Sequence, residues 1–324
     1  MRKSSTPKWR QMVEIEKWLD NTKIASLERC PREFFLRHVL FLTKESEGSV
    51  ATEFGKAFHL ALDLFFTGTP KEEAINKACL KLQESIACLI EAGNERVYED
   101  GRADLDTLVR ALHYFLTAGA GSELAGLLKS CKTELKLSFK DPETGWSLLG
   151  RIDLLGETHS GSVLLVDFKT TGWSIKNWGN KLITDTQLQT YAFISTATAV
   201  VRNVDAGAYA VLQVQRRRLK SGALSPNVTL DSALLPIALT TDHLLRAEER
   251  FKRAVRLIEE FARANSFDCV WSSCNRLHGI CQFHPLCERF WRAPLSKTEV
   301  VEELEEVAYS LGFVKHRWYP FEET

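Results

Sequence analysis

Two neighbouring segments of the chain end in residues that could bind a cation and act on a phosphate group. Residues 162–166 form a short apolar run after turn-forming residues, which predicts a buried strand leading into Asp167, Phe168 and Lys169. Because side chains alternate along a strand, Asp167 and Lys169 share one face. Burying either charge alone is costly, so the pair indicates chemistry rather than a plain core strand.

A second predicted strand, over residues 146–155, contains Asp153, and residues 156–161 would turn the chain back toward Asp167. With a loop of about five residues, Asp153 lies directly opposite Asp167, with Cβ atoms roughly 5 Å apart. Two carboxylates and one lysine at the same end of a sheet can hold a divalent cation and stabilise a developing negative charge.

A helix over residues 49–66 is the next element that could contribute a functional side chain. Its apolar residues recur at helical spacing: Phe54, Phe58, Ala61, Leu62 and Phe65. Gly55 and His59 lie one turn apart on another side. Glycine inside a helix costs about 1 kcal/mol relative to alanine, so Gly55 suggests a close backbone approach. By residue type alone, a single histidine on such a helix is more often structural than a ligand.

We expect a single domain over residues 1–324, organised in four parts. Residues 22–66 form N-terminal helices, 70–130 a helical insertion, 131–215 a sheet core, and 242–324 a long helix followed by a cysteine-rich region. Within the core, residues 133–139 and 205–215 read as further strands. A helix over 185–201 between strands indicates a βαβ crossover, and places Gln187 and Tyr191 on one face.

The composition argues against a disordered chain, a strongly basic nucleic-acid-binding protein and a membrane-spanning protein. The chain is 44% hydrophobic and 26% charged, which is ordinary for a folded globular protein. Its 42 basic and 42 acidic residues cancel, so any nucleic-acid binding depends on local patches such as residues 215–220. No apolar run approaches the 18 residues of a membrane span, and no signal peptide is evident, so we expect a cytoplasmic protein without membrane association.

Together these residues resemble the RecB-type nucleases of the PD-(D/E)XK superfamily. The resemblance rests on five items in the family's order: Gly55-x-x-x-His59, Glu134, Gly150-Arg151-Ile152-Asp153, Asp167-Phe168-Lys169-Thr170-Thr171, and Gln187-Leu188-Gln189-Thr190-Tyr191. Each item alone is weak. Their order and their placement on the expected elements make the combination specific.

The resemblance implies roles for the site residues. His59, Asp153, Asp167 and the backbone carbonyl of Phe168 would bind Mg²⁺ or Mn²⁺, and Lys169 would orient the attacking water and stabilise the phosphate. Gln187 and Tyr191 would complete the site or contact DNA, whereas the role of Glu134 stays open. An imidazole among oxygen ligands makes Mn²⁺ as suitable as Mg²⁺.

The cysteines carry a second resemblance, to the iron–sulfur members of this group, such as the CRISPR-associated exonuclease and the AddB subunit of a helicase–nuclease. In these proteins one N-terminal and three C-terminal cysteines hold a [4Fe–4S] cluster, which implies the ligands Cys30, Cys274, Cys281 and Cys287. The interval of six residues between Cys274 and Cys281 departs from the usual two. Zn²⁺ is the alternative, with His278 or His284 replacing one thiolate. Cys269, beside Val270 and Trp271, is interpreted as a buried apolar residue outside the group.

We therefore expect an α/β protein with a restriction-endonuclease-like core, a mixed sheet flanked by helices. The expected activity is metal-dependent hydrolysis of DNA, most simply as an exonuclease on single-stranded ends, in recombination, repair, phage replication or CRISPR adaptation. The sequence lacks a helicase P-loop, so unwinding would come from a helicase, recombination or CRISPR partner. The alternative is a DNA-binding or assembly subunit with a vestigial nuclease site and a structural iron–sulfur or zinc site.

Overall fold

The computed structural model describes residues 15–44, 49–98, 100–182, 185–264, 266–276, 279–290, 293, 298–319 and 321. The chain forms two compact units, each built from separate segments. The first comprises Met1–Glu47, Ser138–Leu149 and Arg246–Glu322, and the second comprises Gly48–Leu137 and Gly150–Leu245 with the last two residues. Strands β3 (Leu128–Lys140) and β4 (Ser147–Thr158) each cross a boundary between the segments.

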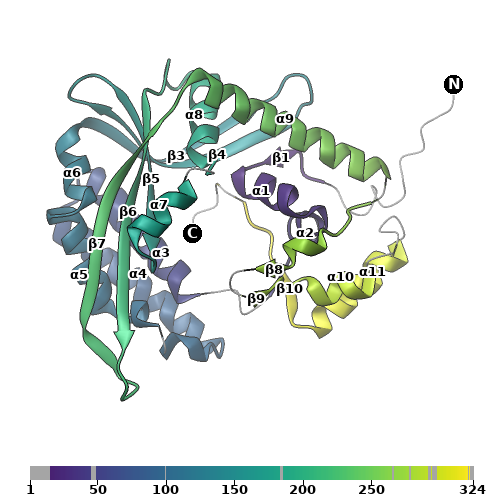
Figure 1. The fold of residues 1–324 in the computed structure, drawn as a ribbon, viewed down its shortest axis with the longest axis horizontal. Coiled ribbons are helices and arrows are strands. Elements are labelled where there is room, and N and C mark those ends of the chain that lie inside the picture. Colours follow the sequence, from purple (N-terminus) through teal and green to yellow (C-terminus); the bar gives the residue numbers. More distant parts are fainter. Residues whose placement is uncertain are drawn as a thin grey trace. The chain divides into compact units, whose positions relative to one another are not determined.

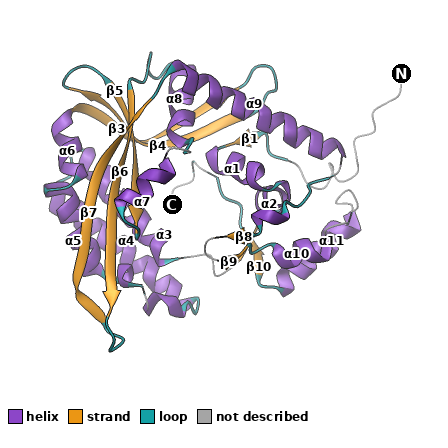
Figure 2. Cartoon of the chain, in the orientation of Figure 1, coloured by secondary structure: helices purple, strands orange, loops and turns teal. Residues whose placement is uncertain are grey.

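The second unit is built on a mixed sheet, and Figure 2 separates its strands from the surrounding helices by colour. β4 pairs antiparallel with β5 (Val163–Thr171), β5 parallel with β6 (Ala206–Arg218), and β6 antiparallel with β7 (Leu224–Ala238). β3 pairs with β4. The parallel step requires a crossover, which α7 (Ile175–Leu182) and α8 (Gln187–Ala197) supply. The predicted βαβ unit is therefore confirmed, whereas α7 and β7 were not assigned from the sequence.

A helical layer covers one face of this sheet (Figure 1). It contains α3 (Val50–Phe66), α4 (Lys71–Glu91), η4 (Glu95–Tyr98), η5 (Gly101–Ala103), α5 (Leu105–Thr117) and α6 (Ala120–Leu127). Helix α3 begins where the Ser49 hydroxyl accepts a hydrogen bond from the Thr52 backbone N–H. Residues 71–127 are thus largely helical, and that they form an insertion stays a prediction. The run of helix is interrupted at Gly119, where a Cβ atom would collide with Ser232 and the Phe115 backbone.

Alternation along β5 decides which side chains join the core. Leu164, Val166 and Phe168 belong to the apolar cluster formed with the helical layer. Phe168 is 2% exposed, and its ring stacks on Phe66 with centroids 5.9 Å apart. Burying such side chains stabilises the fold by about 1.5–3 kcal/mol each. Asp167 and Lys169, which were predicted to share one face, consequently both point away from this cluster.

The first unit contains β1 (Trp18–Leu19), which pairs parallel with the start of β4, and the helices α1 (Asn21–Arg29), α2 (Pro31–Phe34) and η2 (Phe35–Val39). Its other elements are β2 (Leu42–Lys44), α9 (Thr241–Ala264, which begins in the second unit), η6 (Trp271–Ser273), β8 (Asn275–Arg276), β9 (Gly279–Ile280), α10 (His284–Phe290), α11 (Thr298–Ser310) and β10 (Phe313–Lys315). Helix α2 begins directly after Cys30, and its first turn contains Pro31, because proline is tolerated there.

The helices of the described residues include none with the length and apolar character needed to cross a membrane.

Candidate active site

The site forms where strands β4 and β5 of the second unit cease to pair. Their last cross-strand pairs run from Glu157–Val163 to Leu154–Val166, so Asp153 and Asp167 are the next residue on each strand. Instead of continuing the ladder, an Asp153 Oδ2 atom accepts the Phe168 backbone N–H at 2.7 Å. The two acids are therefore held at one end of the sheet, as the hairpin geometry predicts.

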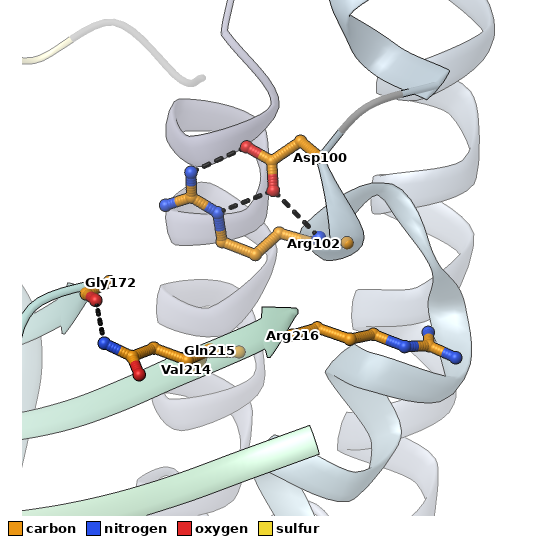
Figure 3. A pocket seen from close by; sticks show the side chains of 7 residues that line it. Asp100, Arg102, Gly172, Val214, Gln215 and Arg216 are labelled. Atoms are coloured by element: carbon orange, nitrogen blue, oxygen red, sulfur yellow. Dashed lines mark hydrogen bonds and ion pairs between the residues drawn. The ribbon is translucent and has the colours of Figure 1, made fainter. Parts of the chain in front are cut away.

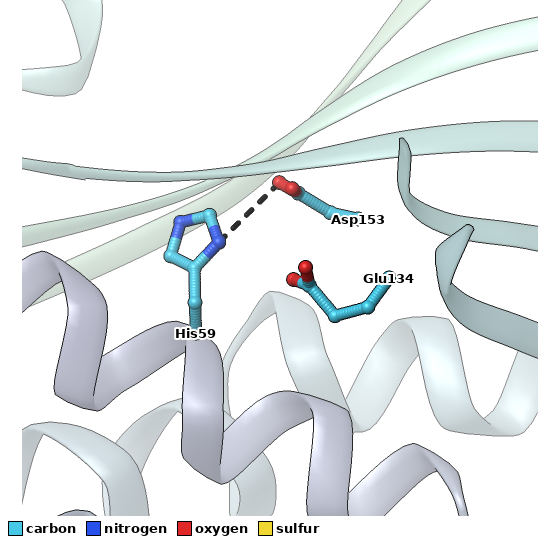
Figure 4. A group of neighbouring side chains, drawn as sticks. All are labelled: His59, Glu134 and Asp153. Atoms are coloured by element: carbon cyan, nitrogen blue, oxygen red, sulfur yellow. Dashed lines mark ion pairs between the residues drawn. The ribbon is translucent and has the colours of Figure 1, made fainter. Parts of the chain in front are cut away.

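Three side chains of this region could hold a metal ion together. One donor atom from each of His59, Glu134 and Asp153 lies within 4.8 Å of the other two (Figure 4). His59 comes from α3, Glu134 from β3 and Asp153 from β4, and the His59 Nδ1 atom is 3.6 Å from Asp153 Oδ2. Two carboxylates and one imidazole suit a divalent cation that prefers oxygen ligands but accepts nitrogen.

The charges of this group act on each other. Burial opposes the charged form of His59, but the negative charge of Asp153 prevails and raises the His59 pKa. Burial likewise opposes ionisation of Asp153, but His59, Lys169 and the Phe168 N–H prevail and lower the Asp153 pKa. The carboxylate of Asp153 is thus kept ionised, which is the form that binds metal.

Glu134 occupies an unusual backbone position for a strand residue. Its φ of 46° lies in the left-handed region, where a residue with a side chain stores strain of about 1–3 kcal/mol. Arg151 fixes its carboxylate, with Nε 3.1 Å from Oε2. Burial and the nearby Asp153 charge raise the Glu134 pKa. The sequence left the role of Glu134 open, whereas the structure places it beside His59 and Asp153.

Asp167 pairs with the lysine of its own motif. Its side chain is only 1% exposed, and its Oδ2 atom is 2.6 Å from the Lys169 Nζ atom. Burial, with a contribution from the charge of Asp153, raises the Asp167 pKa to about 7 against the opposing effect of Lys169. Burial opposes the charge of Lys169, but the surrounding acids prevail and raise its pKa. Lys169 therefore remains an ammonium group at neutral pH.

Helix α8 connects to Lys169 through a chain of hydrogen bonds. Lys169 Nζ donates to Gln187 Oε1 at 3.0 Å, and Gln187 Nε2 donates to the Tyr191 hydroxyl at 2.8 Å. The i, i+4 spacing read from the sequence therefore corresponds to a direct contact. Gly150 makes room for this helix, because a Cβ atom there would lie 3.1 Å from Tyr191 Cδ1 and Ile194 Cδ1. The glycine of the Gly150–Asp153 motif thus serves packing, and its aspartate serves chemistry.

Asp185 and Tyr209 also adjoin the site, and the sequence analysis did not single them out. Asp185 Oδ1 accepts the Gln187 backbone N–H at 2.7 Å, and its charge acts on Lys169. Tyr209 is fully buried on β6 directly beside Asp167, and burial together with Asp185 raises its pKa. The one local signal was the position of Asp185 just before the predicted α8, where an acid commonly caps a helix.

Two sequence predictions about the site stand differently. Asp167 was expected among the metal ligands, and this stays a prediction: the metal-capable group of the described residues contains Glu134, and Asp167 contacts Lys169 beside it. Gly55 was expected to permit a close approach of α3. A Cβ atom at Gly55 would instead meet Thr170 Oγ1 at 3.6 Å, an ordinary contact, so space does not require glycine there. The Phe168 carbonyl remains a predicted ligand.

The cysteines predicted to bind a cluster all lie in the first unit. Cys30, Cys281 and Cys287 are buried, and Cys274 is half-buried. The Val270 N–H points at Cys30 Sγ over 3.5 Å, and the Cys281 N–H donates to the Cys274 carbonyl at 2.7 Å. Within the described part of the chain, however, the sulfur atoms form no group as compact as that of His59, Glu134 and Asp153. His284 packs its ring on Trp271, and His278 lies outside the described residues.

Cys269 does not behave as the isolated apolar residue that was expected. It is half-buried, and its thiol shares a hydrogen bond with the thiol of Cys287. This bond, assisted by Arg32, lowers the Cys269 pKa to about 7 and raises that of Cys287. Residue type and neighbours in sequence could not reveal this contact, because α10 brings Cys287 to it through the fold.

Comparison with known proteins assigns the family. The family model of the PD-(D/E)XK nuclease superfamily matches residues 21–288, so the chain belongs to that superfamily. Members use divalent metal ions, and the group of His59, Glu134 and Asp153 could bind one.

Curated proteins yield no match. Similar solved structures include SSO0001, with 12% identity, a TM-score of 0.30, and coverage of 77% of this chain and 81% of the other. They also include a candidate exonuclease from Eubacterium rectale, with 11% identity, a TM-score of 0.37, and coverage of 82% and 88%.

Proposed function

We propose that the protein is a divalent-metal-dependent deoxyribonuclease that acts as an exonuclease on single-stranded DNA ends. One observation carries this proposal. A metal-capable group of His59, Glu134 and Asp153 lies beside a lysine whose ammonium is fixed on two sides, by Asp167 at 2.6 Å and by Gln187 at 3.0 Å. A metal ion and a nearby ammonium group can together stabilise the negative charge that develops on a phosphodiester during hydrolysis.

Each side chain of the site has a distinct proposed role. His59, Glu134 and Asp153 would hold Mg²⁺ or Mn²⁺, with Asp167 and the Phe168 carbonyl as further candidate ligands. When bound, the ion supplies the charge that polarises a scissile phosphodiester. Lys169 can donate a hydrogen bond to a phosphate oxygen or to the attacking water. Gln187 and Tyr191 keep Lys169 in place, since their hydrogen bonds form a continuous chain.

A cleavage assay with end-labelled single-stranded DNA tests the activity. The purified chain should release labelled product with Mn²⁺ or Mg²⁺ and none with EDTA. Asp167→Ala should abolish cleavage while leaving the fold intact, because removal of one of two neighbouring buried acids relieves repulsion. Asp106→Asn, at an exposed acid paired with Arg110 on α5, is the matched control and should cleave like the parent.

Parent-level cleavage by Asp167→Ala would refute the assignment of the site. A parent that binds DNA but never cleaves it, with either metal, would favour the assembly-subunit alternative. Circular single-stranded DNA separates the two modes of cleavage, because an exonuclease needs an end. Cleavage of the circle at the rate of the linear strand would refute the exonuclease proposal and leave the nuclease proposal standing.

We also propose that Cys30, Cys274, Cys281 and Cys287 hold a structural [4Fe–4S] cluster. The buried arginine Arg32 lies near these cysteines, and its positive charge supports the presence of an anionic group there. Arg32 is 3% exposed, acts electrostatically on Cys287 and Cys269, and its Nε and Nη1 atoms find no hydrogen-bond partner among the described residues. Leaving such donors unpaired is costly, whereas thiolates and sulfide of a cluster would accept from them.

Anaerobic purification tests the cluster. The protein should be brown, with broad absorption at about 400 nm from charge transfer between thiolate and iron. Alanine at any of the four cysteines should remove the colour and lower the melting temperature. Cys88→Ala, at an exposed cysteine of α4, is the control and should change neither. Colourless protein with stoichiometric zinc would refute the iron–sulfur assignment.

A further inference from the structure

A pocket of about 280 Å³ lies in the second unit, at the ends of strands β5 and β6. One wall is the η5 turn, with Asp100, Gly101 and Arg102. The other wall is the strand ends, with Gly172, Val214, Gln215 and Arg216 (Figure 3). None of these residues belongs to the catalytic or metal-binding groups of the candidate active site.

The pocket continues the strand that carries the catalytic lysine. The β5–β6 ladder includes the pair Lys169–Val211 and ends at Thr171–Gln213, so Gly172 follows directly. Gly172 lies three positions after Lys169, which is roughly 10 Å along a strand and equals about three stacked nucleotides. A strand of DNA with its scissile phosphate at Lys169 could therefore reach the pocket within a few nucleotides.

Arg102 is a positively charged side chain at this pocket that is held in place but has hydrogen-bond donors to spare. Its Nε and Nη2 atoms donate to the two oxygens of Asp100 at 2.9 and 2.6 Å, and its side chain is 29% exposed. Nη1 has no hydrogen-bond partner in the described part of the chain. A guanidinium has five N–H donors, so the pair with Asp100 orients Arg102 and leaves donors for a phosphate oxygen.

Arg216 has a different, structural role. The Arg216 guanidinium donates hydrogen bonds to Asp104, Thr107 and the Ser225 carbonyl. Arg216 also packs closely on Gly101, because a Cβ atom at Gly101 would lie 2.8 Å from the Cβ atom of Arg216. Figure 3 shows its side chain extending away from the pair of Arg102 and Asp100. Arg216 thus packs the η5 turn against β6 and holds Arg102 near the strand ends.

Along the chain, an exposed aromatic residue lies next to each wall of the pocket. Among the described side chains of the second unit, the exposed large aromatics are Tyr98, 66% exposed, and Trp173, 44% exposed. Trp173 directly follows Gly172, and its backbone N–H donates to Thr171 Oγ1 at 3.0 Å. Tyr98 ends η4, two residues before Asp100. A cation between exposed aromatic rings is the pattern by which proteins bind single-stranded DNA, through phosphate contact and base stacking.

We propose that this pocket, with Trp173 and Tyr98 at its sides, binds single-stranded DNA next to the bond that is cleaved. Arg102 contacts a phosphate, and the Trp173 ring stacks on an unpaired base. The proposal rests on the proposed nuclease function and specifies how its substrate is selected. A duplex cannot present an unstacked base to Trp173, so the pocket favours single strands over duplex ends.

Binding of a fluorescein-labelled oligothymidylate to the full chain, in EDTA to prevent cleavage, tests the pocket by fluorescence anisotropy. Trp173→Ala should raise Kd roughly 5- to 100-fold, the loss of one stacked base, and Trp173→Phe should recover part of it. Arg102→Gln should make the slope of log K against log salt less negative by about 0.7, the loss of one phosphate contact on a single strand.

Two matched controls use side chains outside the pocket. Arg110→Gln removes a 52% exposed arginine paired with Asp106, and Leu80→Ala removes a 60% exposed apolar side chain. Neither should change Kd by more than about twofold, and neither should change the salt slope by as much as Arg102→Gln does. Equal losses in the controls, or parent-like binding by both pocket variants, would overturn the proposal. An equal loss on blunt duplex DNA in Trp173→Ala would also overturn it.

Cleavage assays distinguish failure of the pocket from failure of the nuclease proposal. If the parent cleaves DNA, the pocket variants should show a raised KM with a smaller change in kcat. Parent-like KM values in an active enzyme would refute the pocket alone. If the parent never cleaves but Trp173→Ala and Arg102→Gln still weaken binding of the single strand, the nuclease proposal fails and the binding site stands.

Discussion

Replacing Gln187 by alanine should slow catalysis without weakening substrate binding. Gln187 Oε1 accepts a hydrogen bond from Lys169 Nζ at 3.0 Å, and the other close partner of that ammonium is Asp167 at 2.6 Å. Without Gln187, Lys169 is held from one side only and can turn toward Asp167, away from a phosphate. The loss should therefore fall on kcat rather than on KM.

The structure sets the size of this effect. A hydrogen bond to a charged group contributes about 1.5–3 kcal/mol, which corresponds to a roughly 10- to 150-fold change in rate. The Lys169 side chain is 29% exposed, so water can replace part of the lost contact. We therefore expect the lower part of that range, about 10- to 30-fold in kcat. Gln187→Glu keeps an oxygen acceptor and should recover part of the activity.

Gln189→Ala provides the control, because it removes the same side chain type two residues further along α8. Initial rates on end-labelled single-stranded DNA at saturating Mn²⁺ give kcat and KM for each variant, and urea unfolding verifies that each is folded. A kcat within twofold of the parent for Gln187→Ala, or an equal loss in Gln189→Ala, would refute the proposed positioning of Lys169.

Three further predictions concern other parts of the chain. His59→Ala should raise the Mn²⁺ concentration needed for half-maximal cleavage, and excess Mn²⁺ should restore part of the rate. His113→Ala, at an exposed histidine beside Glu72, should leave the metal titration unchanged, and an unchanged titration in His59→Ala itself would return His59 to a structural role. Gly150→Ala should destabilise the fold by about 1–3 kcal/mol in urea unfolding, since its Cβ would press on Tyr191 and Ile194 at 3.1 Å. Gly126→Ala, a helical glycine with open space around it, should be neutral or stabilising, and equal effects at both sites would contradict the packing argument. Burial lowers the pKa of His38 to about 3, so between about pH 6.5 and 3 the unfolded chain binds a proton that the native chain excludes. The unfolding free energy should thus fall by up to about 2 kcal/mol as the pH drops from 7.5 to 5, and a His38→Gln variant with the same acid sensitivity would contradict this assignment.

Several features of the site followed from local patterns in the sequence. Alternation along the β5 segment predicted that Asp167 and Lys169 share one face, and the structure assigns Val166 and Phe168, which alternate with them, to the apolar cluster. Helical spacing predicted that Gln187 and Tyr191 share a face, and their side chains are hydrogen-bonded. Such predictions succeed because the period of a strand or helix is a local property.

Other features depend on contacts between distant segments and were not predictable from local patterns. The strained φ of Glu134 and its pairing with Arg151 depend on how β3 meets β4. The raised pKa of Asp167 depends on its burial and on the charges of Lys169, Asp153 and His59 around it. The thiol contact of Cys269 with Cys287 likewise requires the packing of α10. Spacing in the sequence carries no information about any of these.

The discontinuous make-up of the first unit has a consequence for folding during synthesis. Phe34 and Phe35 at the start of the chain pack on Phe267, and Glu28 pairs with Arg250. More than 200 residues of the second unit and its connections are translated between these partners, which takes on the order of 10–40 s at the usual speed of a ribosome. The second unit can form its own core during this interval, whereas the N-terminal helices must wait with apolar side chains uncovered. We therefore expect the N-terminal helices to be the part of the nascent chain most dependent on chaperones.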